Sequence, residues 1–113
     1  MELARAVLVY CVFANPAEAE RVCTTVVREG MAACANILGE CTSFYTWKGT
    51  FQTSLESPAV LKTTTLRYPA LEKRIKQLHS YENPAIVALP IAKGSKPYLK
   101  WIAGCCKPVK KKR

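Results

Sequence analysis

Six cysteines and one histidine are the residues of this 113-residue chain best suited to bind a transition metal or to form a Cys–His nucleophile. The cysteines are Cys11, Cys23, Cys34, Cys41, Cys105 and Cys106. They form no C-x-x-C pair, and a lone histidine gives no H-x-x-H pair, so the spacing argues against a zinc site. Thiolate and imidazole remain acceptable ligands for copper.

The cysteine pattern favours free thiols over disulfides. The first four cysteines lie within apolar segments, where a thiol behaves as a small hydrophobe. The N-terminus is a poor signal peptide because Glu2 interrupts the basic leader, so an oxidising compartment is not expected. We predict a cytoplasmic protein in which only the adjacent pair Cys105 and Cys106 is exposed.

The single histidine, His79, stands in "HSYENPAIVALPI", where a helical pattern ends and an apolar run begins. A connector role is one interpretation, because imidazole at a helix C-terminus can bond the last carbonyls and complement the helix dipole. A Cys–His nucleophile is another, but Glu82 is the only nearby acid that could orient the ring. We predict that the protein is not an enzyme.

A second group of candidate binding residues lies between residues 41 and 64. Tyr45 and Trp47 alternate and therefore share one face of a predicted strand, as core, interface or ligand-contacting aromatics do. Glu56 and Lys62 are an even number of residues apart, so they also face the same way as each other. They are interpreted either as an ion pair or as polar anchors for a ligand in a cleft.

Composition and charge restrict the classes of partner. Half of the residues are hydrophobic, and the length suits one domain. No apolar run is long enough for a transmembrane helix. The net charge is +9, but residues 107–113 hold five of the basic side chains, which leaves +4. A short basic end without aromatic residues is interpreted as solvated, so neither a membrane nor a nucleic acid is expected as a partner.

Hydrophobic periodicity predicts the elements that must position these residues. Their expected order is strand 6–13, helix 15–30, strand 31–39, two strands within 41–64, helix 68–80, strand 85–91 and helix 95–104. Asn15 as N-cap, Glu18 in a capping box and Gly30 as terminator define the first helix. Lys48 and Gly49 supply the turn of a hairpin.

Two residues set further local expectations. Pro58 lies inside the second strand of the hairpin. Because proline has no backbone N–H to donate, we expect that stretch to be an edge strand or to contain a bulge. Ser95 is expected to cap the last helix.

The order β-α-β-β-α-β plus a final helix is the split βαβ arrangement of ferredoxin-like α+β folds, with two helices on one face of an antiparallel sheet. We assign residues 1–105 to one such domain and 106–113 to a basic tail. The strands at 6–13 and 85–91 are apolar on both sides, but two helices cover only one face. The sequence therefore predicts self-association, with the 41–64 hairpin available to pack on neighbouring subunits.

Other activities hosted by this fold lack their motifs here. The strands carry no RNP1-type run of basic, glycine and aromatic residues, as an RNA-recognition module requires. The loop after the first strand has no C-x-x-C, as a copper chaperone would, and no glycine-rich phosphate loop occurs.

Five segments occur in an order that, taken together, resembles the CutA family of divalent-cation tolerance proteins over about residues 6–103: "EGMAACANIL", "SFYTWKGTF", "ESPAVLKTT", "HSYENPAIVALPI" and "YLKWI". The resemblance implies a compact homotrimer, similar to the PII signalling proteins, that binds divalent metals and copper above all. In the family's bacterial copper-binding pattern, Cys11 matches a first-strand cysteine and His79 matches the second of two histidines. Leu78 stands in place of the first histidine, and Ala85 in place of a usual glutamate.

The resemblance also implies an inter-subunit cleft with a conserved aromatic pair. The residues assigned to this cleft are Tyr45, Trp47, Glu56, Lys62 and Tyr81. Two hypotheses from different classes follow. One is a trimeric copper-binding protein of the metal response, with Cys11 and His79 as ligands. The other is a PII-like signalling or scaffold module that binds a small ligand or a protein in the cleft.

Overall fold

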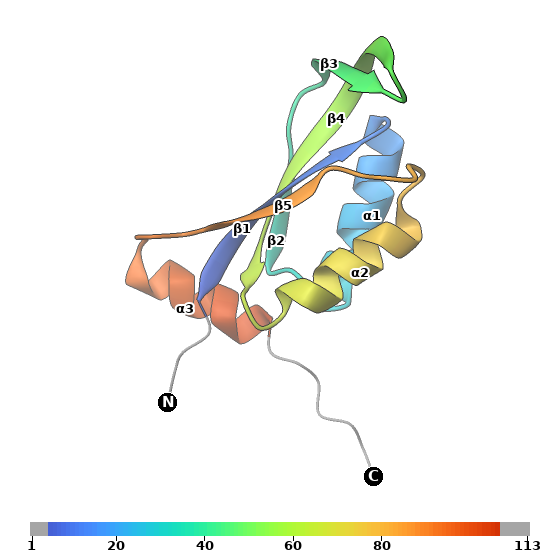
Figure 1. Cartoon of the computed structure of the whole chain (residues 1–113). Helices are drawn as coiled ribbons and strands as arrows, with labels where there is room; N and C mark the ends of the chain where they lie inside the picture. The colour runs from blue at the N-terminus through green and yellow to red at the C-terminus, as the bar shows by residue number, and fades with distance from the viewer. Residues whose placement is uncertain (1–4, 107–113) are drawn as a thin grey trace.

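A computed structural model describes residues 5–106 of the chain (Figure 1). Its elements are β1 Ala6–Phe13, α1 Pro16–Arg28, β2 Cys34–Ile37, β3 Cys41–Trp47, β4 Thr50–Thr64, α2 Tyr68–Leu78, β5 Ile86–Pro90 and α3 Lys96–Cys105. The antiparallel strand order is β2-β4-β1-β5, and β3 pairs with β4 outside this path. The ferredoxin-like α+β fold is confirmed. Within the described residues, no helix is long and apolar enough to cross a bilayer.

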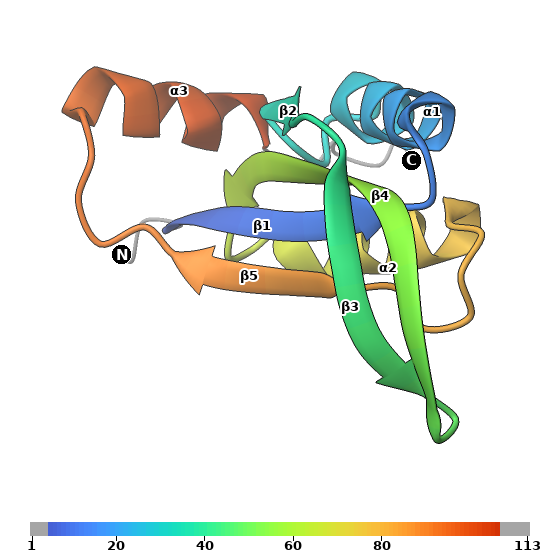
Figure 2. The same ribbon diagram turned by 90° about the horizontal axis from the view of Figure 1, so that it is seen from above.

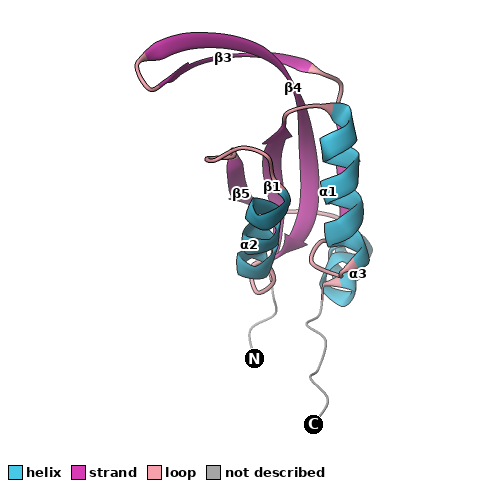
Figure 3. Ribbon diagram, turned by 90° about the vertical axis from the view of Figure 1, so that its right-hand side faces the viewer, coloured by secondary structure: helices cyan, strands magenta, loops and turns pink. Residues whose placement is uncertain are grey.

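Strand β4 is 15 residues long and pairs with three other strands. From residue 57 onward it pairs with β1, and over residues 59–62 it also pairs with β2. Its first part pairs only with β3, from Thr50 to Glu56. Residues 41–56 therefore form a two-stranded ribbon, here called the arm, that projects beyond the sheet (Figures 2 and 3).

Pro58 corrects the expected edge strand, because β4 is a central strand. The alternative expectation of a bulge is met, because the register beside Pro58 shifts by one residue between Ile37 opposite Ala59 and Cys41 opposite Glu56. Pro58 pairs in register with Val12 of β1. Its carbonyl accepts a bond from the Leu38 amide at 2.9 Å, just where pairing with β2 ends. In a strand the N–H and C=O of one residue point to the same side, so the missing donor faces the break between β2 and β3.

The turn and cap signals are realised with two differences. Lys48 and Gly49 have φ values of 51° and 78°, as a tight hairpin turn requires. Asn15 Oδ1 accepts from the Glu18 amide at 2.9 Å, but the Glu18 side chain bonds the Ala14 amide and not that of the N-cap. Ser95 occupies the N-cap position of α3 without making a side-chain capping bond, so the expected cap is wrong in that respect.

The core lies between one face of the sheet and helices α1 and α2 (Figure 3). Alternate residues of β1 point into it, and they are Val7, Val9, Cys11 and Phe13. On the opposite face, among the described residues, only α3 covers one end of the sheet, where Ala6 packs with Ile102 and Lys62 lies beside Tyr98. On that face Val87 and Leu89 of β5 are 52% and 50% exposed. The two-sided apolar character of β5 is therefore real, and its part of this face stays open.

All six cysteines are free, which agrees with the prediction for the first four. Cys105 is exposed, but the expectation that Cys106 shares this exposure is wrong. Cys106 packs against Ile102 and Ala33, and its sulfur accepts a bond from Thr63 Oγ1 at 3.6 Å. Helix α3 carries the thiol onto the end of the sheet, so Cys106 belongs to the packed domain. The remainder of the predicted basic tail, residues 107–113, lies outside the described residues.

Gly49→Ala tests the left-handed turn of the arm. Gly49 has φ 78° and no neighbouring atom within 4 Å of an added Cβ, so the substitution should cost only backbone strain, about 1–2 kcal/mol in free energy of unfolding. Gly39→Ala is the matched control, because that site is equally open without a positive φ. Urea unfolding at one fixed protein concentration gives both values. Equal stability of the two variants would contradict the strain.

Candidate functional site

His79 is a buried connector at the end of α2. Its Nε2 lies 2.7 Å from the Val12 carbonyl of β1, and its Nδ1 accepts the Tyr81 amide at 3.0 Å. A carbonyl can only accept and an amide N–H can only donate, so the partners assign the neutral tautomer protonated on Nε2. The ring therefore joins α2 and β1 to the loop at residues 80–85, and both nitrogens are engaged.

Glu18 is buried beside this ring and ties the same loop to α1. Its two oxygens accept from the Ala14 amide and the Ser80 amide, each at 3.1 Å, and Oε1 lies 3.8 Å from His79 Nδ1. Burial opposes ionisation of Glu18, but the bonds from Ser80 and Ala14 outweigh it and lower the pKa of the carboxyl. Glu18 is thus held as a carboxylate.

Aromatic packing fixes the orientation of the His79 ring. Phe13 stacks on it with centroids 5.0 Å apart and planes 16° apart. Tyr81 contacts it in a tilted arrangement, with centroids 4.9 Å apart. Tyr81 is therefore positioned twice, by its amide bond to His79 and by its ring, and its phenol is directed away from the core toward the arm.

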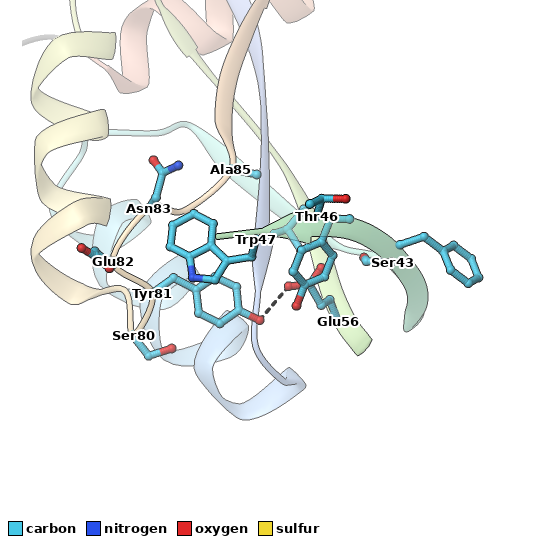
Figure 4. Close-up of a pocket in the computed structure, with 12 residues that line it drawn as sticks. Ser43, Thr46, Trp47, Glu56, Ser80, Tyr81, Glu82, Asn83 and Ala85 are labelled. Carbon is cyan, nitrogen blue, oxygen red and sulfur yellow. Dashed lines mark hydrogen bonds between the residues drawn. The ribbon is translucent and has the colours of Figure 1, made fainter. Parts of the chain in front are cut away.

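A pocket of about 630 Å³ lies between the arm and the 80–85 loop (Figure 4). Its walls come from β3, from Val12, from the loop and from Glu56 of β4. The Tyr81 hydroxyl donates to Glu56 Oε2 at 2.6 Å and so closes one side of the pocket. Burial and then the bond to Glu56 raise the pKa of Tyr81, which keeps the phenol protonated as a donor.

Four of the five predicted cleft residues meet in this pocket, and they are Tyr45, Trp47, Glu56 and Tyr81. The shared face of Tyr45 and Trp47 follows from their register with β4. The fifth residue, Lys62, does not line this pocket. Its Nζ donates to Asn36 Oδ1 at 2.8 Å and sits 5.9 Å from the centre of the Tyr98 ring.

Glu56 and Lys62 do not form an ion pair with each other within the described chain. They share strand parity, but they are six positions apart, which corresponds to roughly 20 Å of extended chain. Parity fixes the face of a side chain and says nothing of position along the strand. The ion-pair interpretation is therefore wrong within one chain.

The two predicted copper ligands have different environments. The Cys11 thiol is fully buried in the core, and burial, followed by the effects of Cys23 and Glu18, raises its pKa to about 12. His79 has no nitrogen lone pair free of a hydrogen bond. Across residues 5–106, no three His, Cys, Asp or Glu side chains are grouped to hold a metal. Copper binding by Cys11 and His79 stays a prediction.

The acid beside the histidine is the residue that sequence reasoning missed. Glu82, the expected candidate, lines the pocket, whereas Glu18 lies beside the imidazole. The capping position of Glu18 placed it at the start of α1, but nothing in the sequence indicates that α1 starts next to the end of α2. That proximity is a product of the sheet order.

Comparison with known proteins gives a consistent result. A family model described as CutA1 divalent ion tolerance protein matches residues 7–105. The divalent-cation tolerance protein CutA of Thermus thermophilus is 44% identical over 84 residues, 74% of this chain and 82% of that protein. Mouse Protein CutA is 35% identical over 88 residues, 78% of this chain but 50% of that protein. The crystal structure of CutA1 from Oryza sativa superposes with a TM-score of 0.90 at 31% identity, covering 95% of this chain and 98% of that one.

Glu18→Gln tests the buried carboxylate. The lowered pKa means that ionised Glu18 stabilises the fold above its ordinary pKa of 4.5, and that this contribution disappears as pH falls below that value. We expect a loss of about 2 kcal/mol in free energy of unfolding near pH 7, shrinking markedly near pH 4. Urea midpoints at both pH values measure it.

Glu20→Gln is the control for this experiment, because Glu20 is an exposed acid on the same helix. It should change stability by less than about 0.5 kcal/mol at either pH. A Glu18→Gln deficit that persists unchanged in acid would show that shape, and not charge, sets the role of this residue.

Proposed function

The chain belongs to the CutA1 divalent ion tolerance family, and from that premise we propose that it serves tolerance of divalent cations, copper among them, as a homotrimer without enzymatic activity. The observation that carries the assembly is the apolar surface that one chain leaves uncovered. The six free thiols support the cytoplasm as its compartment, because reducing conditions keep cysteines unpaired.

The uncovered surface has two parts. One is the open face of the sheet, with Val87 and Leu89. The other is the outer face of the arm, where Phe44, Phe51 and Leu55 are each more than 60% exposed. Phe44 and Phe51 stack with their ring centres 6.4 Å apart. Burial of a large apolar side chain contributes about 1.5–3 kcal/mol, so packing these surfaces on further copies of the chain is strongly favourable.

The geometry of the arm fits this assembly. The register places Phe44, Phe51 and Leu55 on the face opposite Tyr45 and Trp47. One side of the ribbon is therefore free to pack on a neighbouring subunit while the other forms the pocket wall. A projecting ribbon with an apolar outer face reaches beyond its own domain, as an element exchanged between subunits would (Figure 2).

A second candidate function rests on the pocket. A cavity of about 630 Å³ with aromatic walls and a few polar groups has the size and composition of a small-molecule site. This favours a PII-like signalling or scaffold module whose cleft binds a small ligand or a protein. The two functions are compatible, because a protein of the metal response can also be controlled by a ligand.

Copper at Cys11 and His79 requires a rearrangement. Copper accepts thiolate and imidazole, but His79 must first release Val12 or Tyr81, and Cys11 must lose a proton whose pKa is about 12. An affinity measured for such a site is reduced by the small fraction of molecules in the competent state. We therefore propose modest affinity for copper.

Sedimentation equilibrium at low micromolar protein tests the assembly. The wild type should sediment as a trimer, and Leu89→Glu should weaken it because a charge would enter the covered sheet face. Leu66→Glu is the matched control, since Leu66 is 72% exposed in the turn before α2 and belongs to neither apolar surface. A folded wild-type monomer would refute the homotrimer, as would equal dissociation of both variants.

Calorimetric titration with copper(I) under reducing conditions tests the metal ligands. Cys105→Ser should serve as the background, because it removes the exposed thiol. Adding Cys11→Ser or His79→Ala should weaken copper at least tenfold, and affinity should rise between about pH 6 and about pH 8 because ligation releases protons. Cys23→Ser, another buried thiol, is the control. Unchanged affinity in both site variants would remove Cys11 and His79 from the ligand set.

A further inference from the structure

We propose that the pocket between the arm and the 80–85 loop binds a small organic ammonium cation. This deepens the ligand-binding candidate above and rests on that function. Three properties of the described residues carry it, namely the sign of the charge in the pocket, the aromatic walls and the size of the space.

The charge of the pocket is opposite to that of the chain. The chain has 17 Lys and Arg against 8 Asp and Glu, but the pocket is lined by two glutamates, Glu56 and Glu82, and by no basic residue within the described part of the chain. An anionic ligand such as a phosphate would meet two carboxylates in this lining and no basic side chain among the described lining residues. Charge complementarity therefore selects a cation.

Glu56 is the group that would receive the positive charge. It is only 8% exposed, and Oε2 is occupied by the Tyr81 hydroxyl. Among residues 5–106 no side chain or amide donates to Oε1, and Figure 4 shows the carboxylate directed at the pocket. Oε1 is therefore accessible from the pocket, and an ammonium group placed there can pair with its charge.

The aromatic walls select an organic ammonium over a metal ion. Tyr45, Trp47 and Tyr81 all line the pocket, and ring faces attract ammonium groups through their quadrupole. The Trp47 indole already has one such neighbour, because Lys48 Nζ lies 5.7 Å from its ring centre. Divalent ions need several oxygen, nitrogen or sulfur ligands instead, and no three His, Cys, Asp or Glu side chains of the described residues are grouped here.

The size of the pocket agrees with this class of ligand. About 630 Å³ is far more than a bare ion fills and lies in the range of small-molecule sites. Ser43, Ser80 and Asn83 place hydroxyl and amide groups on the lining, so a ligand carrying a polar group beside its ammonium would find partners. A hydroxylated quaternary ammonium such as choline has this form.

The test uses choline and its neutral carbon isostere, 3,3-dimethylbutan-1-ol, on the full-length protein. Trp101→Leu provides the reporter, because it leaves Trp47 as the sole tryptophan. Trp101 stacks on Tyr98 away from the pocket. Trp47 fluorescence should change saturably with choline, with a Kd on the order of 1 mM, and the isostere should bind at least tenfold more weakly. Sodium chloride at equal ionic strength controls for screening.

Two variants locate the site, with calorimetry as the readout. Glu56→Gln should weaken choline about tenfold by removing the charge, and Trp47→Leu should weaken it about fivefold by removing the ring. Their matched controls are Glu20→Gln, an exposed acid, and Trp101→Leu, an exposed indole. Both should bind choline as the wild type does.

Absence of choline binding by the wild type would overturn the inference, as would equal binding of the isostere or indifference to Glu56→Gln and Trp47→Leu. Sedimentation of the same samples separates this from the proposed function. A trimer that ignores choline leaves the tolerance function standing and removes the ligand class. A monomer that binds choline with the expected variant pattern removes the trimer and keeps the ligand.

Discussion

The site depends on one buried arrangement, in which Glu18 and His79 hold the ends of three elements together. A carboxylate and an imidazole out of contact with water must have their hydrogen bonds satisfied inside the fold. They achieve this with backbone groups at the end of β1, before α1 and just after α2. The 80–85 loop consequently starts from a fixed position, although it has no regular secondary structure.

The fixed start of the 80–85 loop also fixes one wall of the pocket. The amide of Tyr81 is held by His79, and its hydroxyl reaches Glu56 at the base of the arm. Strand β4 connects the arm rigidly to the sheet, because the same strand forms the centre of the sheet and one of the two strands of the arm. The pocket is therefore framed by the core through Tyr81 and by the sheet through Glu56, and its acidic wall sits on a rigid element.

Local signals in the sequence predicted the elements well and the long-range neighbours poorly. Asn15, Gly30 and the pair Lys48–Gly49 act through nearest neighbours, so the sequence alone determines their effect. Periodicity also revealed the two-sided apolar strands, because side-chain direction alternates regularly along a strand.

The errors arose where a residue's role depends on a distant segment. Pro58 is tolerated in a central strand only because β2 ends beside it. Cys106 is buried because α3 returns to the sheet, and Glu18 meets His79 because α1 and α2 lie side by side.

The two hydrogen bonds of the buried His79 ring explain why a histidine stands at this position. Imidazole places a donor and an acceptor on opposite edges of one rigid ring, whereas an amide side chain carries both on one carbon. Histidine is therefore the side chain best suited to bond the Val12 carbonyl through one nitrogen and the Tyr81 amide through the other, and this structural role does not require a metal.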